Sequence, residues 1–131
     1  MSKQVTSISE EGFAAQNEIR DYSVDIDATG ESAPDTLESL LAAYGSCYVP
    51  ALRVGAEQRD VGELGRIEID IEGELNDDDK LDAVSFAVKT EADVDDEQAE
   101  KVIERADELC KVGDAVKESL EAEVTVHGDA F

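Results

Sequence analysis

The two cysteines, Cys47 and Cys110, carry the side chains of this sequence that are best suited to covalent chemistry. Each lies on an apolar stripe of helical spacing, so each could also be a small buried hydrophobic residue. If a helix restarts at Pro50, its unpaired amide donors would stabilise a thiolate at Cys47. Cys110 is expected in the last turn of its helix, where the dipole makes a thiol less acidic. The pair therefore suits an attacking thiolate at Cys47 and a resolving thiol at Cys110.

Other reactive chemistry finds little support in the sequence. The lone histidine, His127, alternates with Val126 on an expected strand and is interpreted as an outward-facing residue. Two cysteines and one distant histidine make a poor zinc set, and the run Asp77–Asp79 lacks the glycine and glutamate of a calcium loop. No glycine-rich phosphate loop, nucleophile elbow or Ser-His-Asp set is present. We therefore expect no metal and no cofactor.

The first cysteine needs a long helix to position it. Two strands are expected first, at Val5–Ser9 and Glu18–Asp27, where apolar and polar residues alternate. Ser32 and Asp35 resemble a capping box, and helical spacing of apolar residues follows over 37–55. The proline inside this segment predicts a kink or a restart.

The second cysteine lies in a helix that follows a hairpin. Residues 67–72 and 84–89 alternate in hairpin fashion around the turn Asn76–Asp79. A capping box then opens a helix over residues 95–113, and a last strand is expected at Leu120–Val126. The resulting order, β-β-α-β-β-α-β, favours an α+β fold.

Length and charge restrict the class of protein. A chain of 131 residues suits a single domain spanning residues 1–131. The 34 acidic and 11 basic residues give a net charge of −23, which disfavours nucleic acid and anionic membranes as partners. Because the acidic residues are spread over the polar sides of the elements, the composition is typical of halophiles that accumulate salt.

The expected compartment is the cytoplasm. The sequence contains no apolar run of membrane-spanning length, and its first residues lack the apolar core of a signal peptide. Two cysteines in the cytoplasm are more often free, metal-bound or redox-active than joined in a permanent disulfide.

Two segments resemble the osmotically inducible protein C / organic hydroperoxide resistance (OsmC/Ohr) family. The segment from Pro34 to Cys47, PDTLESLLAAYGSC, is similar to the family helix that ends in the reactive cysteine. The segment from Cys110 to Val116, CKVGDAV, is similar to the family sequence around the second cysteine. The resemblance implies an OsmC-like fold with antiparallel sheets, a long kinked central helix and an intertwined homodimer. It also implies that Cys47 attacks the peroxide and that Cys110 resolves it.

The resemblance also suggests two auxiliary site residues, a glutamate before the reactive helix and an N-terminal arginine. Glu38 and Arg20 are the candidates, although Leu37 stands at the position where the family has its glutamate. Lys111 stands where the family usually has proline. On an unbroken helix, Glu38 would point away from Cys47, because nine residues turn a helix through about half a revolution more than two full turns.

The sequence thus predicts a thiol-dependent peroxidase. Its substrate would be an organic hydroperoxide and its second partner a cellular dithiol reductant. The alternative is a non-catalytic module of the same fold that binds an apolar ligand or senses redox state through its disulfide.

Overall fold

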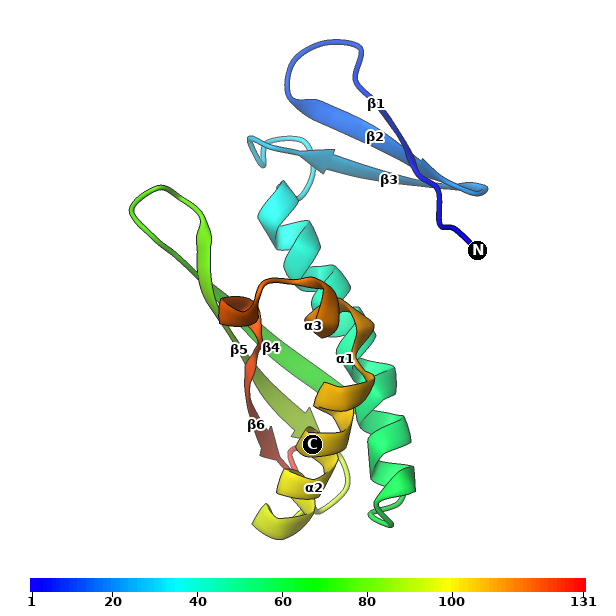
Figure 1. Cartoon of the computed structure of the whole chain (residues 1–131), viewed down its shortest axis with the longest axis vertical. Helices are drawn as coiled ribbons and strands as arrows, with labels where there is room; N and C mark the ends of the chain where they lie inside the picture. The colour runs from blue at the N-terminus through cyan, green and yellow to red at the C-terminus, as the bar shows by residue number, and fades with distance from the viewer. The chain divides into compact units, whose positions relative to one another are not determined.

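The computed structural model describes residues 1–131, which form two compact units, Met1–Ala42 and Ala43–Phe131 (Figure 1). The fold is α+β, as the sequence predicted, with one three-stranded sheet in each unit. A long helix, α1 (Thr36–Gln58), begins in the first unit and ends in the second. None of the helices combines the length and the apolar character that crossing a bilayer requires.

The first unit is an antiparallel sheet of three strands, β1 (Thr6–Ile8), β2 (Ala14–Ile19) and β3 (Tyr22–Asp27). The expectation of one strand over 18–27 was wrong, because a tight turn with Arg20 at φ 54° divides this stretch. Strand β2 escaped detection because its central residues are polar on both faces. A positive φ at a residue other than glycine carries no clear sequence signal.

The start of α1 is fixed by a capping box that lies three residues later than expected. The Asp35 carboxylate accepts the N–H of Glu38, and the Glu38 carboxylate accepts the N–H of Asp35, at 2.8 and 2.9 Å. Ser32 instead donates its N–H and hydroxyl to the buried carboxylate of Asp27, which also accepts two bonds from Thr29. The loop before α1 is therefore organised around Asp27.

Helix α1 continues through Pro50 without the restart that the sequence predicted. Proline has no N–H, so the carbonyl four residues before it has no helical donor. Before Pro50, this is the carbonyl of Ser46. Both Ser46 and Pro50 are exposed, so water can reach that carbonyl and the helix can continue.

The sheet of the second unit contains β4 (Ile67–Leu75), β5 (Leu81–Thr90) and β6 (Glu123–His127). Strands β4 and β5 form the expected antiparallel hairpin, and Asn76 closes its turn by accepting the amides of Asp78 and Lys80. Strand β6 pairs parallel to β5, which differs from the all-antiparallel pairing that was expected. A parallel neighbour needs a crossover connection, and the helices that hold the second cysteine supply it.

The crossover consists of α2 (Asp96–Leu109), α3 (Lys111–Ala115) and a 3₁₀ turn (Glu118–Leu120). The expected capping box at Asp95 and Gln98 is confirmed, with both of its hydrogen bonds present. The single helix expected over 95–113 is divided in two, because the backbone is extended between α2 and α3.

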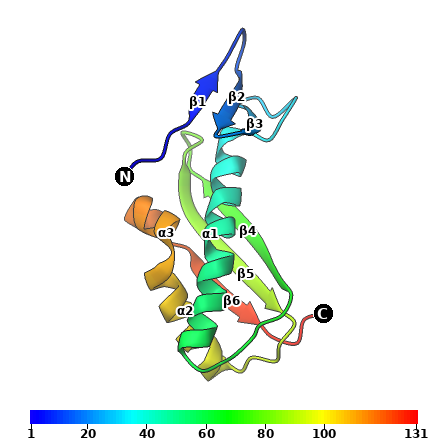
Figure 2. The ribbon, with the colours of Figure 1, turned by 90° about the vertical axis from the view of Figure 1, so that its right-hand side faces the viewer.

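Helices α1 and α2 cover one face of the second sheet (Figure 2). Two glycines of α1 allow this close packing: Gly45 lies against Ile71 of β4, and Gly55 lies against the backbone of α2 at Val102. Any side chain at these positions would meet atoms of the neighbouring element. The most deeply buried side chains of this core are Tyr48, Leu52, Ala56, Phe86, Val88, Val102 and Ala106.

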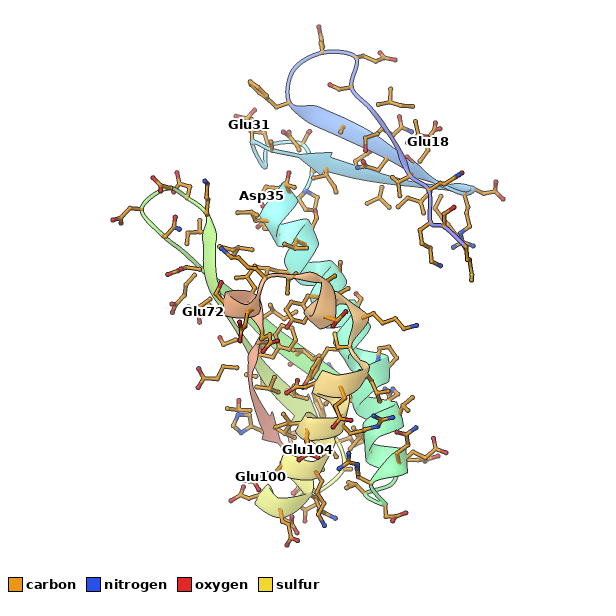
Figure 3. All side chains as sticks on the ribbon, viewed as in Figure 1. Glu18, Glu31, Asp35, Glu72, Glu100 and Glu104 are labelled. Atoms are coloured by element: carbon orange, nitrogen blue, oxygen red, sulfur yellow. The ribbon has the colours of Figure 1, made fainter.

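Acidic side chains project outward from each unit, as Glu18 and Glu31 show in the first and Glu72 and Glu100 in the second (Figure 3). With 34 acidic and only 11 basic residues, most carboxylates have no cationic partner. The ion pairs that form, such as Arg59 with Glu104 at 3.1 Å, are largely exposed and contribute little individually.

Candidate active site

The second unit brings together two cysteines that lie far apart in the sequence. Cys47 is half-buried near the middle of α1, and Cys110 is the residue between α2 and α3, with only 3% of its surface exposed. Both are free thiols, and the Cys110 side chain lies within hydrogen-bonding reach of Cys47. Helix α3 lies beside α1 (Figures 1 and 2), so its first residues also reach Cys47.

The environment of Cys47 favours a thiolate. Burial acts to raise the pKa of this thiol, but hydrogen bonds from the Val112 amide, the Cys110 thiol and the Lys111 amide, together with the Lys111 charge, outweigh burial and lower it. The expectation of an activated Cys47 therefore has a different cause from the one that the sequence suggested. The donors come from the start of α3, and not from a restart of α1 at Pro50.

The environment of Cys110 favours the protonated thiol. Burial raises the pKa of Cys110, the Gly113 amide lowers it by donating to Sγ at 3.4 Å, and the neighbouring Cys47 raises it. The balance is a raised pKa. The sequence argument gave the same order of acidity from a helix-end dipole, whereas the structure attributes it first to burial.

Two tyrosines of α1 flank the cysteines. Tyr48 is buried and donates its hydroxyl to the Asp107 carboxylate at 2.8 Å, while the Tyr44 hydroxyl accepts the amide of Ala122 at 3.0 Å. Both rings meet Phe86 edge-on, with centroids 4.7 and 5.1 Å away. These contacts hold the middle of α1 against the sheet and fix the position of Cys47 between the tyrosines.

Each cysteine borders its own cavity. Cys47 lines a mostly apolar cavity of about 350 Å³, in which its neighbours are Pro50, Ala51, Val54, Leu109 and Lys111. Cys110 lines a more polar cavity of about 570 Å³ together with Tyr44, Tyr48, Asp107, Glu121 and Ala122, among others. Lys111 borders both cavities, which otherwise open onto different cysteines.

Of the predicted site residues, the structure brings together Cys47 and Cys110. Glu38 belongs to the first unit, where its carboxylate caps α1 at Asp35. Arg20 also belongs to the first unit, at the turn between β2 and β3, with its guanidinium 5.1 Å from the centre of the Tyr22 ring. Catalytic roles for Glu38 and Arg20 stay predictions.

Sequence reasoning missed the groups that surround the cysteines. Lys111 was noted only as a departure from a motif, yet its charge and amide act on Cys47. Tyr44 and Tyr48, one helical turn apart around Cys47, belong to the apolar pattern over 37–55, which did not single them out. Asp107, one turn before Cys110, had no sequence signal, because its role depends on the buried hydroxyl of Tyr48.

Comparison with known proteins agrees with this fold. Residues 28–125 match the family model described as OsmC-like protein, and the chain belongs to that family. An uncharacterized protein from Haloferax volcanii, a halophilic archaeon, is 41% identical over 128 residues, covering 98% of this chain and 97% of the relative. The acidic composition was interpreted as halophilic, and this relative agrees with that interpretation.

Solved structures share the fold at low sequence identity. The OsmC-like protein from Mycoplasma pneumoniae superposes with a TM-score of 0.80 at 11% identity, covering 98% of this chain and 96% of that one. The organic hydroperoxide resistance protein OhrB of Bacillus subtilis superposes with a TM-score of 0.72 at 22% identity, covering 97% of this chain and 98% of that one. The predicted OsmC-like fold is confirmed by these likenesses.

Proposed function

We propose that this protein is a thiol peroxidase that reduces organic hydroperoxides through Cys47 and Cys110. The observation that carries the proposal is the unequal acidity of the two neighbouring thiols. Burial acts to raise the pKa of Cys47, but amide and thiol donors and the Lys111 charge outweigh it and lower the pKa. The pKa of Cys110 is raised, first by burial. The mostly apolar cavity beside Cys47 suits a peroxide with a hydrocarbon tail. A fold shared with a protein named for organic hydroperoxide resistance supports the same substrate class.

The proposed reaction begins when the Cys47 thiolate attacks one peroxide oxygen and the O–O bond breaks. The departing alkoxide takes up a proton and leaves as an alcohol, while Cys47 becomes a sulfenic acid. The Cys110 sulfur then attacks the Cys47 sulfur, water leaves, and a disulfide forms. A dithiol returns both cysteines to the thiol state and is itself oxidised to a disulfide. The reducing cytoplasm is the compartment that would supply such a dithiol.

The cation beside the proposed thiolate is Lys111. Its charge lowers the pKa of Cys47, acting with the amide and thiol donors against the opposing effect of burial. Arg20 and Glu38 are proposed as further contributors on the strength of the family resemblance alone. Replacing Arg20 by Ala and measuring the rate of Cys47 oxidation tests that contribution, and an unchanged rate removes Arg20 from the site.

We also propose that the protein acts as a homodimer. In the first sheet, Ala15, Asn17, Ile19, Tyr22, Val24 and Ile26 point to one face, as the pairing register of β2 and β3 requires, and all of them except Asn17 are apolar or aromatic. Tyr22 and Val24 are 62% and 44% exposed. A small sheet with one apolar face needs a covering partner, and a second copy of the chain is the expected one. Light scattering at micromolar concentration should give about twice the 14.1 kDa chain mass, and a monomer contradicts the proposal.

The decisive experiment compares the consumption of cumene hydroperoxide by the wild type, Cys47→Ser and Cys110→Ser, in multimolar KCl with a dithiol reductant. With the dithiol present, wild type should turn over and Cys47→Ser should be inactive. Without the dithiol, Cys110→Ser should reduce about one equivalent of peroxide and then stall as its sulfenic acid. A wild type that forms its disulfide but does not turn over would favour a redox-sensing module. Unimpaired turnover by Cys47→Ser would refute the proposed chemistry.

A further inference from the structure

We infer that the reductant enters by the cavity on the Cys110 side, attacks Cys110 Sγ and is a dithiol without negative charge, whereas the peroxide reaches Cys47 through the apolar cavity. This inference rests on the proposed function, because it concerns the disulfide that the peroxidase reaction forms. It assigns the larger cavity, which the oxidative half of the reaction leaves unused, to the second substrate.

The geometry of the two cavities carries the inference. The apolar cavity of about 350 Å³ is bordered by Cys47 and not by Cys110, and the cavity of about 570 Å³ is bordered by Cys110 and not by Cys47. The larger cavity lies within the range of about 300–1,000 Å³ that small-ligand sites occupy. A molecule bound in it meets the disulfide from the Cys110 side.

The chemistry of thiol exchange favours the same sulfur. In a disulfide, attack on one sulfur expels the other as a thiolate, and the thiol of lower pKa leaves faster. The Val112 and Lys111 amides and the Lys111 charge stabilise a departing thiolate at Cys47 against the opposing effect of burial. The Gly113 amide, which donates to Sγ at 3.4 Å, and the Val112 amide also act on Cys110, but burial and the neighbouring Cys47 outweigh them and raise its pKa. Attack at Cys110 therefore expels the better leaving group.

The reductive step balances as follows. A thiolate of the dithiol attacks Cys110 Sγ, the Cys47–Cys110 bond breaks, and Cys47 leaves as a thiolate. The second thiol of the reductant loses its proton and attacks the reductant sulfur of the mixed disulfide. Cys110 departs and takes up that proton. Two electrons pass to the protein, and the reductant leaves as an internal disulfide.

The charge of the cavity restricts the reductant. The cavity is bordered by one ammonium group, that of Lys111, and by the carboxylates of Asp107, Glu108, Asp114 and Glu121. Glu108 is paired with Arg105 at 2.8 Å, which leaves three carboxylates without a cation in an ion pair. An anionic thiol would be repelled from this cavity, and an amine-bearing or uncharged thiol would enter more readily.

The test begins with the disulfide formed by diamide, so that it does not depend on peroxide turnover. The oxidised protein is mixed with cysteamine, a cationic monothiol that cannot close an internal disulfide, quenched with acid after short times and mapped by peptide mass spectrometry. The adduct is expected on Cys110. An adduct that forms first on Cys47 overturns the inference. If the adduct forms on Cys110 but the wild type does not turn over peroxide in the separate assay, only the proposed peroxidase function is overturned.

A second measurement tests the cavity. The ratio of the rates with cysteamine and with the anionic monothiol mercaptoacetate is compared in wild type, Glu121→Gln and Glu100→Gln. Glu121 borders the cavity and Glu100 is an exposed residue of α2 that does not. Removing one nearby charge should lower the ratio about twofold to fivefold, measured at the lowest KCl concentration at which all three proteins keep the wild-type circular dichroism spectrum, and the Glu100 variant should behave as wild type. Equal ratios in Glu121→Gln and wild type overturn the assignment of this cavity, and Asp114→Asn provides a second variant.

Discussion

Removing the Tyr48 hydroxyl should destabilise the protein by a small amount that depends on pH. Tyr48→Phe keeps the ring and its edge-on contact with Phe86 at 5.1 Å. It removes a single hydrogen bond, the 2.8 Å bond to the carboxylate of Asp107. Because the substitution creates no cavity beyond one oxygen atom, the measured change reports on that bond.

The magnitude follows from the two partners. A hydrogen bond to a charged group contributes about 1.5–3 kcal/mol. Asp107 is exposed as a residue, although its hydrogen bond to Tyr48 is partly buried. Water can therefore replace the lost hydroxyl on one side of the carboxylate, and the expected loss at neutral pH falls to about 1 kcal/mol. For a chain of this size, that loss lowers the melting temperature by roughly 3–6 °C.

The pH dependence has a definite sign. Burial raises the pKa of Asp107, and the hydrogen bond from Tyr48 opposes this rise. A carboxyl whose folded pKa is raised stabilises the fold below its unfolded pKa, and this contribution is lost as the pH rises through the folded pKa. Tyr48→Phe removes the opposing bond, so the folded pKa rises further and the loss at high pH increases. The difference between variant and wild type should therefore be largest at neutral pH and shrink below the unfolded value of 3.8.

The assay is thermal unfolding by circular dichroism in multimolar KCl at pH 7 and near pH 3.5. Tyr22→Phe is the control, because it removes the same atom from a tyrosine of the other unit that is 62% exposed in the single chain. If Tyr48→Phe melts with the wild type at pH 7, or if its deficit grows on acidification, the reasoning about Asp107 is wrong. An equal deficit in Tyr22→Phe would show that the effect does not come from this bond.

Further outcomes are expected from the redox site, the helix contact and the surface charge. A dimedone-type probe should label Cys47 in Cys110→Ser and leave Cys110 unlabelled in Cys47→Ser, and labelling of the second variant alone would reverse the assignment. Gly55→Ala would place Cβ 3.2 Å from the Val102 carbonyl oxygen. Crowding should cost about 1–3 kcal/mol and exceed the gain of about 1 kcal/mol in helix propensity, so urea unfolding should show a net loss of stability. A stabilised variant would contradict the close contact. With a net charge of −23, thermal stability should fall when KCl is lowered from molar to millimolar concentration, and equal stability would exclude salt dependence.

Periodicity was a reliable guide wherever a single face of an element is buried. The hairpin of β4 and β5 and the capping box at Asp95 and Gln98 follow from local patterns, and both are present. Strand β2 was missed because neither of its faces is strongly apolar. The pairing of β6 parallel to β5 depends on the path of the crossover, which no local pattern encodes.

The candidate site shows the same division. Both cysteines could be found from residue type and from the two motifs. Their order of acidity was also predicted, but from helix-end dipoles, whereas the structure attributes it to the donors at the start of α3 and to burial of Cys110. The donors to Cys47 could not be found, because a backbone amide such as that of Val112 has no signature in the sequence. Pro50 suggested a helix start just after Cys47, whereas the helix start that acts on Cys47 is that of α3, which reaches it only through the tertiary fold.

The negative charge of the acidic surface opposes the formation of a thiolate in the same chain. Carboxylates in excess raise the pKa of any acid through the field they create, and this would disfavour a thiolate at Cys47. Molar salt shortens the screening length to about 3 Å, which removes distant repulsion but also removes the benefit of a distant cation. The hydrogen bonds that Cys47 receives from the amides of Val112 and Lys111 act at contact and are not screened. In strong salt, a thiolate held by adjacent donors persists where one that depends on a distant cation would not, so the amides of Val112 and Lys111 become more important to Cys47 than any charge beyond contact distance.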